Sequence, residues 1–246
     1  MRRFNFITNM KWWLSDVENA IQRATLKIAP VIDDVAHELK IKENDDLYVV
    51  GGFVRDNVLA ALTGKKITFK DLDLIMPERP VLENNPNILR KRKNSLGGTK
   101  ICTKNFPEID IFQPYTTTID LIVGKYFDFN CNALYYSHYQ KQILPSVYFY
   151  GFTSDRIIDF VNYIYGKNGI EQRYGEASMV ARALKFKVMF HENFGIETKL
   201  SSNILYLLYN MDKQTEQEML NYIGNKVKSK EIQNKIISEY NRLNNR

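Results

Sequence analysis

Apolar residues recur at intervals of three and four in two parts of the chain, one near each end. Near the start this spacing predicts a helix from residue 11 to about 40, which Pro30 kinks or interrupts. Towards the end the same spacing predicts a series of helices. These cover 178–193, 202–211, 213–223 and 229–243.

The middle of the chain holds short apolar or alternating segments, which are typical of strands. Strands are expected over 47–50, 68–76, 99–104, 108–113, 117–123, 143–150 and 156–160. A short helix closed by Gly64 follows the first strand, and residues 130–137 are expected to be helical. Residues 77–98, rich in proline, asparagine and basic residues, are expected to form a loop. This order predicts the α+β class, a mixed β-sheet head with helices followed by an α-helical body.

Composition places the chain among ordinary globular proteins, with 246 residues, 44% hydrophobic and 25% charged. No window is apolar enough for a membrane span, and polar residues interrupt the basic start of the chain, so no membrane partner and a cytoplasmic location are expected. The two cysteines and three histidines show no zinc-ligand spacing. A zinc enzyme is therefore not expected.

The net charge of +6 is concentrated in one segment. Residues 65–104 hold ten basic and four acidic residues, so this segment accounts for the whole excess. A basic segment of this kind favours a polyanionic partner such as a nucleotide or RNA. The RKRK run at 90–93 is equally compatible with a phosphate-binding segment and with a solvated loop.

Candidate chemistry begins with two carboxylates, Asp71 and Asp73, on one expected strand. Alternation places both on the same face with Cα atoms roughly 6–7 Å apart. Carboxylates this close favour a divalent cation, and Mg²⁺ prefers such oxygen ligands together with substrate phosphates. A third carboxylate on another strand would complete a two-metal site. Asp110 is preferred for its central position on a strand, and Glu108 and Asp120 are the alternatives.

A glycine pair precedes these acids. Gly51 and Gly52 follow a strand and open a helix, where backbone N–H groups and the positive end of the helix favour an anion. Arg55 lies one turn into this helix and could form an ion pair with a phosphate.

The segments 47–64 and 70–76, LYVVGGFVRDNVLAALTG and KDLDLIM, resemble the GGxVRD…DxDL signature of one family. This is the family of tRNA nucleotidyltransferases (CCA-adding enzymes) and bacterial poly(A) polymerases, which belongs to the polymerase-β-like nucleotidyltransferases. FDFNCNALYY at 127–136 resembles the family's RRDFTINALAY motif, and RIIDF at 156–160 its "iiDp" strand. Residues 173–197 resemble its EDPLRxLRAxRFAaxLGFxIe helix, so the similarity covers about 47–200.

The resemblance implies a polymerase-β-like nucleotidyltransferase head followed by a helical body. The implied domains are an N-terminal helical segment over 1–46, a catalytic head over 47–160, and a helical neck and body over 161–246 that is shorter than usual for the family.

The resemblance also implies site residues and substrates. Two Mg²⁺ ions would be held by the catalytic residues Asp71, Asp73 and Asp110. The substrate would be an NTP (ATP, CTP or both), the acceptor an RNA 3′ end such as that of tRNA, and the product pyrophosphate. The implied nucleotide-binding residues are Gly51, Gly52, Arg55, Asp128, Asn132, Glu176 and Arg182.

Two other functions remain open. Gly175 and Met179 stand where the family's base-reading helix has polar residues, which favours the same chemistry on a protein or small-molecule hydroxyl. The other function is a catalytically idle, RNA-binding relative, although the clustered acids speak against it. The sequence indicates neither the nucleotide added nor the oligomeric state.

Overall fold

The computed structural model describes residues 12–42, 45–68, 71–76, 82, 85–93, 98–106, 108–113, 119, 123, 127–161 and 171–245. The chain forms two compact units, which are described separately. A sheet unit comprises Trp12–Gly124 and Asn132–Tyr150, and a helical unit includes Lys125–Cys131 and Gly151–Arg246. None of the helices within the described residues is long and apolar enough to cross a membrane.

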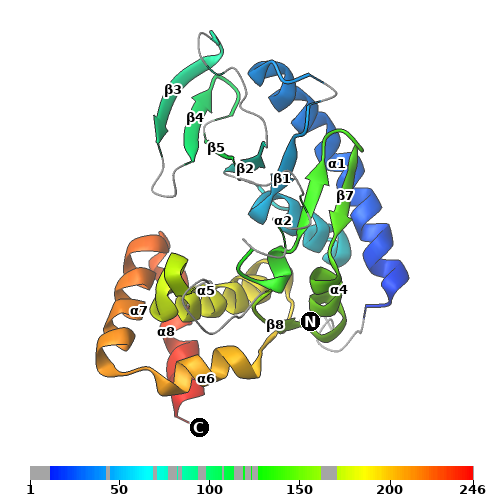
Figure 1. Ribbon diagram of the computed structural model, residues 1–246. Coiled ribbons are helices and arrows are strands. Elements are labelled where there is room, and N and C mark those ends of the chain that lie inside the picture. Colours follow the sequence, from blue (N-terminus) through cyan, green and yellow to red (C-terminus); the bar gives the residue numbers. More distant parts are fainter. Residues whose placement is uncertain are drawn as a thin grey trace, which may run out of the picture. The chain divides into compact units, whose positions relative to one another are not determined.

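The sheet unit is built on a seven-stranded mixed sheet with the order β3-β4-β5-β2-β1-β6-β7 (Figure 1). Neighbouring strands are antiparallel except β2 and β5, which are parallel. The strands are β1 Tyr48–Val50, β2 Leu72–Ile75, β3 Ile88–Lys93, β4 Thr99–Thr103, β5 Ile109–Phe112, β6 Leu134–Ser137 and β7 Gln142–Pro145.

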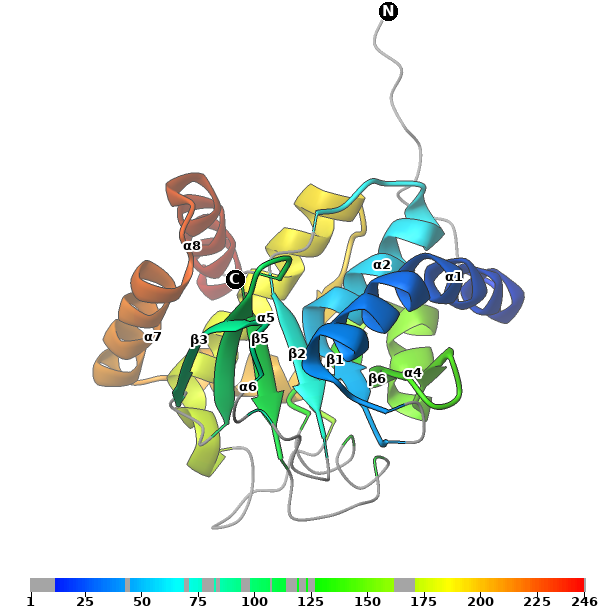
Figure 2. The same ribbon diagram turned by 90° about the horizontal axis from the view of Figure 1, so that it is seen from above.

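Two helices, α1 (Leu14–Leu39) and α2 (Gly51–Thr63), pack against each other (Figure 2), and α2 contacts β1, β2 and β6 while α1 contacts β7. Leu72 and Leu74 of β2 are buried, and alternation places Asp71 and Asp73 on the opposite face of the strand. The two helices therefore provide the core, while the acids face away from it. Helix α4 (Val147–Asp155) follows β7.

The helical unit is centred on α5 (Glu171–Phe194), which contacts the three helices that follow it. Gly175 interrupts α5 with non-helical backbone angles (φ 66°, ψ 154°). The short parallel strands β8 (Ile157–Ile158) and β9 (Lys199–Leu200) pair beside it. Aromatic rings of Phe129, Phe160, Phe186, Phe190 and Phe194 form much of its core. The remaining helices are α6 Ser202–Asn210, α7 Lys213–Lys226 and α8 Lys230–Asn244.

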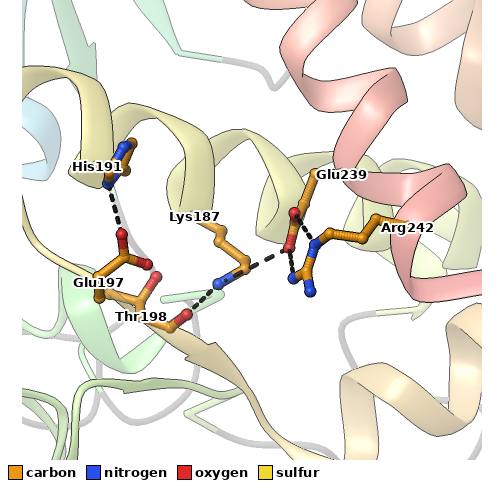
Figure 3. A network of polar contacts seen from close by, with 6 residues as sticks. All are labelled: Lys187, His191, Glu197, Thr198, Glu239 and Arg242. Carbon is orange, nitrogen blue, oxygen red and sulfur yellow. Dashed lines mark hydrogen bonds and ion pairs between the residues drawn. The ribbon is translucent and has the colours of Figure 1, made fainter. Parts of the chain in front are cut away.

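A polar network joins α5 to α8 and to the segment before β9 (Figure 3). Lys187 of α5 donates a hydrogen bond to the carbonyl of Thr198, and its Nζ lies 3.8 Å from Oε1 of Glu239. Arg242 approaches the same carboxylate to 2.6 Å. Burial lowers the pKa of the Lys187 amine. The network thus serves to hold α8 against α5 through a partly buried cation.

Most expected elements are confirmed. The expected first helix is confirmed as α1, but the expected interruption at Pro30 does not occur, because the helix continues through that residue. Strands occur within 47–50, 68–76, 99–104, 108–113 and 156–160. The four C-terminal helices are present, and three of them lie within three residues of their expected bounds, whereas the helix expected over 178–193 already begins at Glu171. The strand expected over 117–123 lies mostly outside the described residues, and the two described positions, Ile119 and Val123, are helical.

Three further expectations are wrong. The loop expected over 77–98 contains β3, whose exposed side chains leave no apolar alternation to reveal a strand. Residues 130–137 form a 3₁₀ turn, Asn130–Asn132, followed by β6 rather than a helix. The strand expected over 143–150 ends at Pro145. There Ser146 Oγ accepts a hydrogen bond from the backbone N–H of Phe149, and α4 begins.

Candidate active site

Three of the expected acids of the sheet unit, Asp71, Asp73 and Asp110, lie immediately before β2, on β2 and on the neighbouring strand β5, respectively. Parallel pairing of β2 with β5 places Asp73 directly opposite Asp110, and Asp71 is an exposed residue immediately before β2. Burial, together with repulsion from the carboxylates of Asp71 and Asp110, raises the pKa of Asp73 to about 6. The strand pairing thus places Asp73 beside Asp110, and Asp71 lies close enough to repel the carboxylate of Asp73.

Lys100 of β4 contacts two of the candidate acids and is a candidate site residue that the sequence analysis did not include. Its Nζ lies 2.9 Å from Oδ2 of Asp110 and also forms an ion pair with Glu108. Burial alone would lower the pKa of Lys100, but the carboxylates of Glu108 and Asp110 outweigh it and raise the pKa. The signal available in the sequence was the short turn between the strands at 99–104 and 108–113, which makes Lys100 and Asp110 cross-strand neighbours.

The alternatives to Asp110 have different positions. Glu108 precedes β5, and its backbone carbonyl accepts a hydrogen bond from the N–H of Leu72. Its side chain is 41% exposed and contacts Lys100. Asp120 lies outside the described residues. Among the described acids, Asp110 is thus the one aligned with Asp73.

The glycine pair forms the junction between β1 and α2. Gly51 has a φ of +73°, a conformation that residues with a side chain rarely adopt. A Cβ built on Gly51 would lie 2.5 Å from Oδ2 of Asp73. A Cβ on Gly52 would lie 3.5 Å from Nη2 of Arg55. The absence of side chains therefore lets the start of α2 approach the carboxylate closely.

Arg55 points into the sheet unit and is only 5% exposed. Its Nε donates to Oδ1 of Asp56 at 2.7 Å, and its Nη1 donates to Oδ1 of Asn132 at 2.6 Å. Two of the residues implied by the resemblance, Arg55 and Asn132, are thus hydrogen-bonded although they lie far apart in the sequence. Their bonds fix the orientation of the guanidinium group.

The other expected residues belong to the helical unit. Arg182 of α5 forms an ion pair with Asp128, whose side chain is 7% exposed, and Oδ1 of Asp128 accepts a hydrogen bond from the N–H of Phe129 at 2.9 Å. Glu176 is exposed, directly after the break at Gly175. The structure therefore pairs Asp128 with Arg182 and leaves Glu176 on the surface.

The donor set suits a hard divalent cation. Among the described residues, no three acidic, histidine or cysteine side chains lie close enough to form a preformed metal-binding site. Burial is the main cause of the raised pKa of Asp73, and repulsion from the carboxylates of Asp71 and Asp110 adds to it. A cation bound by their oxygens would relieve this repulsion, and carboxylates are the protein ligands that Mg²⁺ prefers.

The fold is that of the CCA-adding enzymes. No protein-family model and no curated protein matches the sequence. The CCA-adding enzyme of Thermotoga maritima complexed with tRNA superposes with a TM-score of 0.59 and 16% identity, over 93% of this chain and 53% of that chain. A CCA-adding enzyme in complex with CTP gives 0.56 and 16%, over 93% and 52%. A tRNA-processing enzyme complex gives 0.55 and 18%, over 85% and 55%. The chain thus spans about half the length of the solved structures that it matches.

Proposed function

We propose that this chain, with the fold of the CCA-adding enzymes, is a metal-dependent nucleotidyltransferase that adds nucleotides from an NTP to the 3′ end of an RNA, with tRNA as the acceptor. The observation that carries the proposal is the alignment of Asp73 with Asp110 on adjacent parallel strands, beside the side-chain-free turn at Gly51. Solved structures of this fold include complexes with tRNA and with CTP, which supports these two partner classes.

In the proposed reaction, the oxygen of the RNA 3′-hydroxyl forms a bond to the α-phosphorus of the NTP. The bond from this phosphorus to its bridging oxygen breaks, pyrophosphate leaves, and the hydroxyl proton is released. Catalysis of this kind depends mostly on positioning and charge stabilisation. Bound Mg²⁺, held by Asp71, Asp73 and Asp110, would polarise phosphate oxygens and lower the pKa of the hydroxyl.

The chain's own residues would position the donor. The backbone at Gly51 and Gly52 opens α2, where N–H groups and the helix dipole favour the triphosphate. Arg55, oriented by Asp56 and Asn132, would add a fixed positive charge. The pair formed by Asp128 and Arg182 is proposed to contribute to nucleotide binding, as is Glu176. The substrate would be ATP, CTP or both.

The test is incorporation of label. The full chain with Mg²⁺ is incubated with each α-labelled NTP in turn, and with total tRNA, tRNA lacking its 3′ end, or no RNA. Label is expected in RNA, and the double variant Asp71→Asn/Asp73→Asn is expected to abolish it. Asp34→Asn, an exposed acid on α1, is the matched control and should retain full incorporation.

The outcomes separate the alternatives. Label on the protein or on a small molecule would replace the RNA acceptor with another hydroxyl. Met179 is only 2% exposed and carries no polar group that could pair with a base. The lack of a base-pairing group at this position favours the second function. RNA binding without any incorporation would instead identify an idle relative.

A further inference from the structure

A single row of charged residues crosses four strands of the sheet. Asp73 on β2 is opposite Asp110 on β5, Asp110 is opposite Lys100 on β4, and Lys100 is opposite Arg92 on β3. Directly opposite residues in a sheet project from the same face. The ion pair between Lys100 and Asp110 agrees with this placement. The row therefore runs from two acids at the centre to two cations at the edge.

Arg90 lies on the same face as Arg92, because alternate residues of a strand share a face. Lys91 and Lys93 consequently project from the other face. All four are exposed on β3, the edge strand of the sheet (Figure 1). Within the part of the chain that the structure describes, none of the four forms an ion pair or a side-chain hydrogen bond.

The charge on this face is not balanced within the described residues. Like charges placed directly opposite each other destabilise a sheet, and Arg92 is opposite Lys100. The charge of Lys100 is already matched by Glu108 and Asp110. Arg90 and Arg92 therefore retain positive charge for a ligand from solution. Their forked guanidinium groups suit phosphate oxygens, which accept two parallel hydrogen bonds.

We infer that the face of β3 bearing Arg90 and Arg92 binds the phosphodiester backbone of the acceptor RNA strand, with the 3′ end of that strand towards Asp110. The inference rests on the proposed function, because it assumes that the acceptor is RNA. The two arginines are about 7 Å apart along the strand, which is comparable to the spacing of successive phosphates in an extended single strand. Backbone contacts of this kind position the RNA without reading its sequence.

The opposite face of the same strand supplies a matched control. Arg90→Gln/Arg92→Gln and Lys91→Gln/Lys93→Gln remove the same charge from the same edge but from opposite faces. Binding of a fluorescein-labelled, single-stranded RNA of twelve nucleotides with a free 3′-hydroxyl is measured by fluorescence anisotropy over a range of KCl concentrations. The measurement contains EDTA and no NTP, so that no chemistry occurs.

The arginine variant is expected to lose two phosphate contacts. Each contact to a single strand contributes about 0.7 to the slope of log K against log salt, so the slope should become shallower by about 1.4 and the affinity at 0.1 M salt should fall about 25-fold. The lysine variant should change the affinity by less than about threefold, because screening weakens charges that do not contact the RNA.

Equal losses in the two variants, or no loss in the arginine variant, would overturn the inference. Because charged residues also protect edge strands from aggregation, both variants are checked for dispersity and circular dichroism. If the double arginine variant aggregates, the single variant Arg92→Gln provides the same test with half the change in slope. The proposed function is judged separately, by incorporation with the wild-type chain. If the wild-type chain incorporates label but the arginine variant binds RNA as tightly as the wild type, only the binding face is refuted. If binding depends on the arginine face but the wild-type chain incorporates no label, only the enzymatic function is refuted.

Discussion

A Cβ on Gly51 would lie 2.5 Å from Oδ2 of Asp73, closer than any real contact of a Cβ. The start of α2 can thus lie close to the middle of β2 only because Gly51 has no side chain. This glycine is required for two reasons, because the backbone there also has a φ of +73°. Gly64, at the end of the same helix, has a φ of +67° but no atom within 4 Å of a Cβ.

This difference predicts the effects of Gly51→Ala and Gly64→Ala. Both should lower the free energy of unfolding by about 1–2 kcal/mol through left-handed backbone strain. Only Gly51→Ala should displace Asp73, and it should reduce nucleotide incorporation by about 100-fold, since a misplacement of about 1 Å can have that effect. Urea unfolding and label incorporation check the pair. Equal activity in the two variants would contradict the fit between Gly51 and Asp73.

The pKa of Asp73 predicts how stability depends on pH in the absence of metal. Burial and repulsion by Asp71 and Asp110 raise this pKa from 3.8 to about 6. Between these values the native state keeps a proton that the unfolded state has released, so the free energy of unfolding should fall as the pH rises. The total loss is about 3 kcal/mol and is complete above pH 6 or so.

Asp73→Asn should remove this dependence. In EDTA the variant should match the wild type below pH 4 and become more stable by about 3 kcal/mol at pH 7. Urea unfolding at several pH values measures the difference, with Asp34→Asn as an exposed control that should follow the wild type. A constant difference between Asp73→Asn and the wild type would show that Asp73 does not titrate in this range.

Lys100 predicts a specific response to Mg²⁺. Lys100→Met leaves Glu108 and Asp110 without their cation and should lower the free energy of unfolding by about 1–3 kcal/mol in EDTA. Mg²⁺ should then raise the thermal midpoint of the variant more than that of the wild type, because a bound cation replaces the lost charge. Lys104→Met, an exposed lysine in the turn after β4, is the control. Equal Mg²⁺ responses in all three proteins would argue against a metal at these acids.

The pair of Asp128 and Arg182 predicts a non-additive double substitution. Arg182→Met leaves the carboxylate of Asp128 buried, with a side chain only 7% exposed, and should cost about 3 kcal/mol of unfolding free energy. Asp128→Asn/Arg182→Met removes both charges and should recover part of that loss. Thermal or urea unfolding of the two variants gives the comparison. If the double variant is no more stable than the single one, the loss comes from the packing of the arginine stem and not from its charge.

The candidate acids could be predicted because their signal is local. The spacing of Asp71 and Asp73 places both on one face of a strand, and the turn at Gly51 and Gly52 is visible as a strand followed by a helix. The position of Asp110 opposite Asp73 could not be derived in this way. It depends on a parallel pairing between β2 and β5, with β3 and β4 inserted between them in the sequence. Lys100 was missed for a different reason: the short turn between β4 and β5 indicates that these strands pair, but the partner of Lys100 depends on the exact register of that pairing.

The errors in secondary structure have a related cause. Hydrophobic alternation reveals a strand only when one face is buried, and Leu89 to Lys93 of β3 are exposed or nearly so. The aromatic run at 147–150 resembles a strand in composition. Within α4, which includes this run, the buried residues Phe149 and Phe152 are three apart and therefore fit a helix.

The position of β1 has a consequence for synthesis of the protein. β1 lies between β2 and β6, but Ser137 of β6 is made about 90 residues after its partner Tyr48. At roughly 5–20 residues per second, translation leaves one edge of this apolar strand unpaired for about 5–20 seconds. A nascent chain in that interval exposes backbone groups that a foreign strand can capture. We therefore expect ribosome-bound chains that end before residue 134 to depend on chaperones, and chains long enough for Pro145 to have left the ribosome to be released from that dependence.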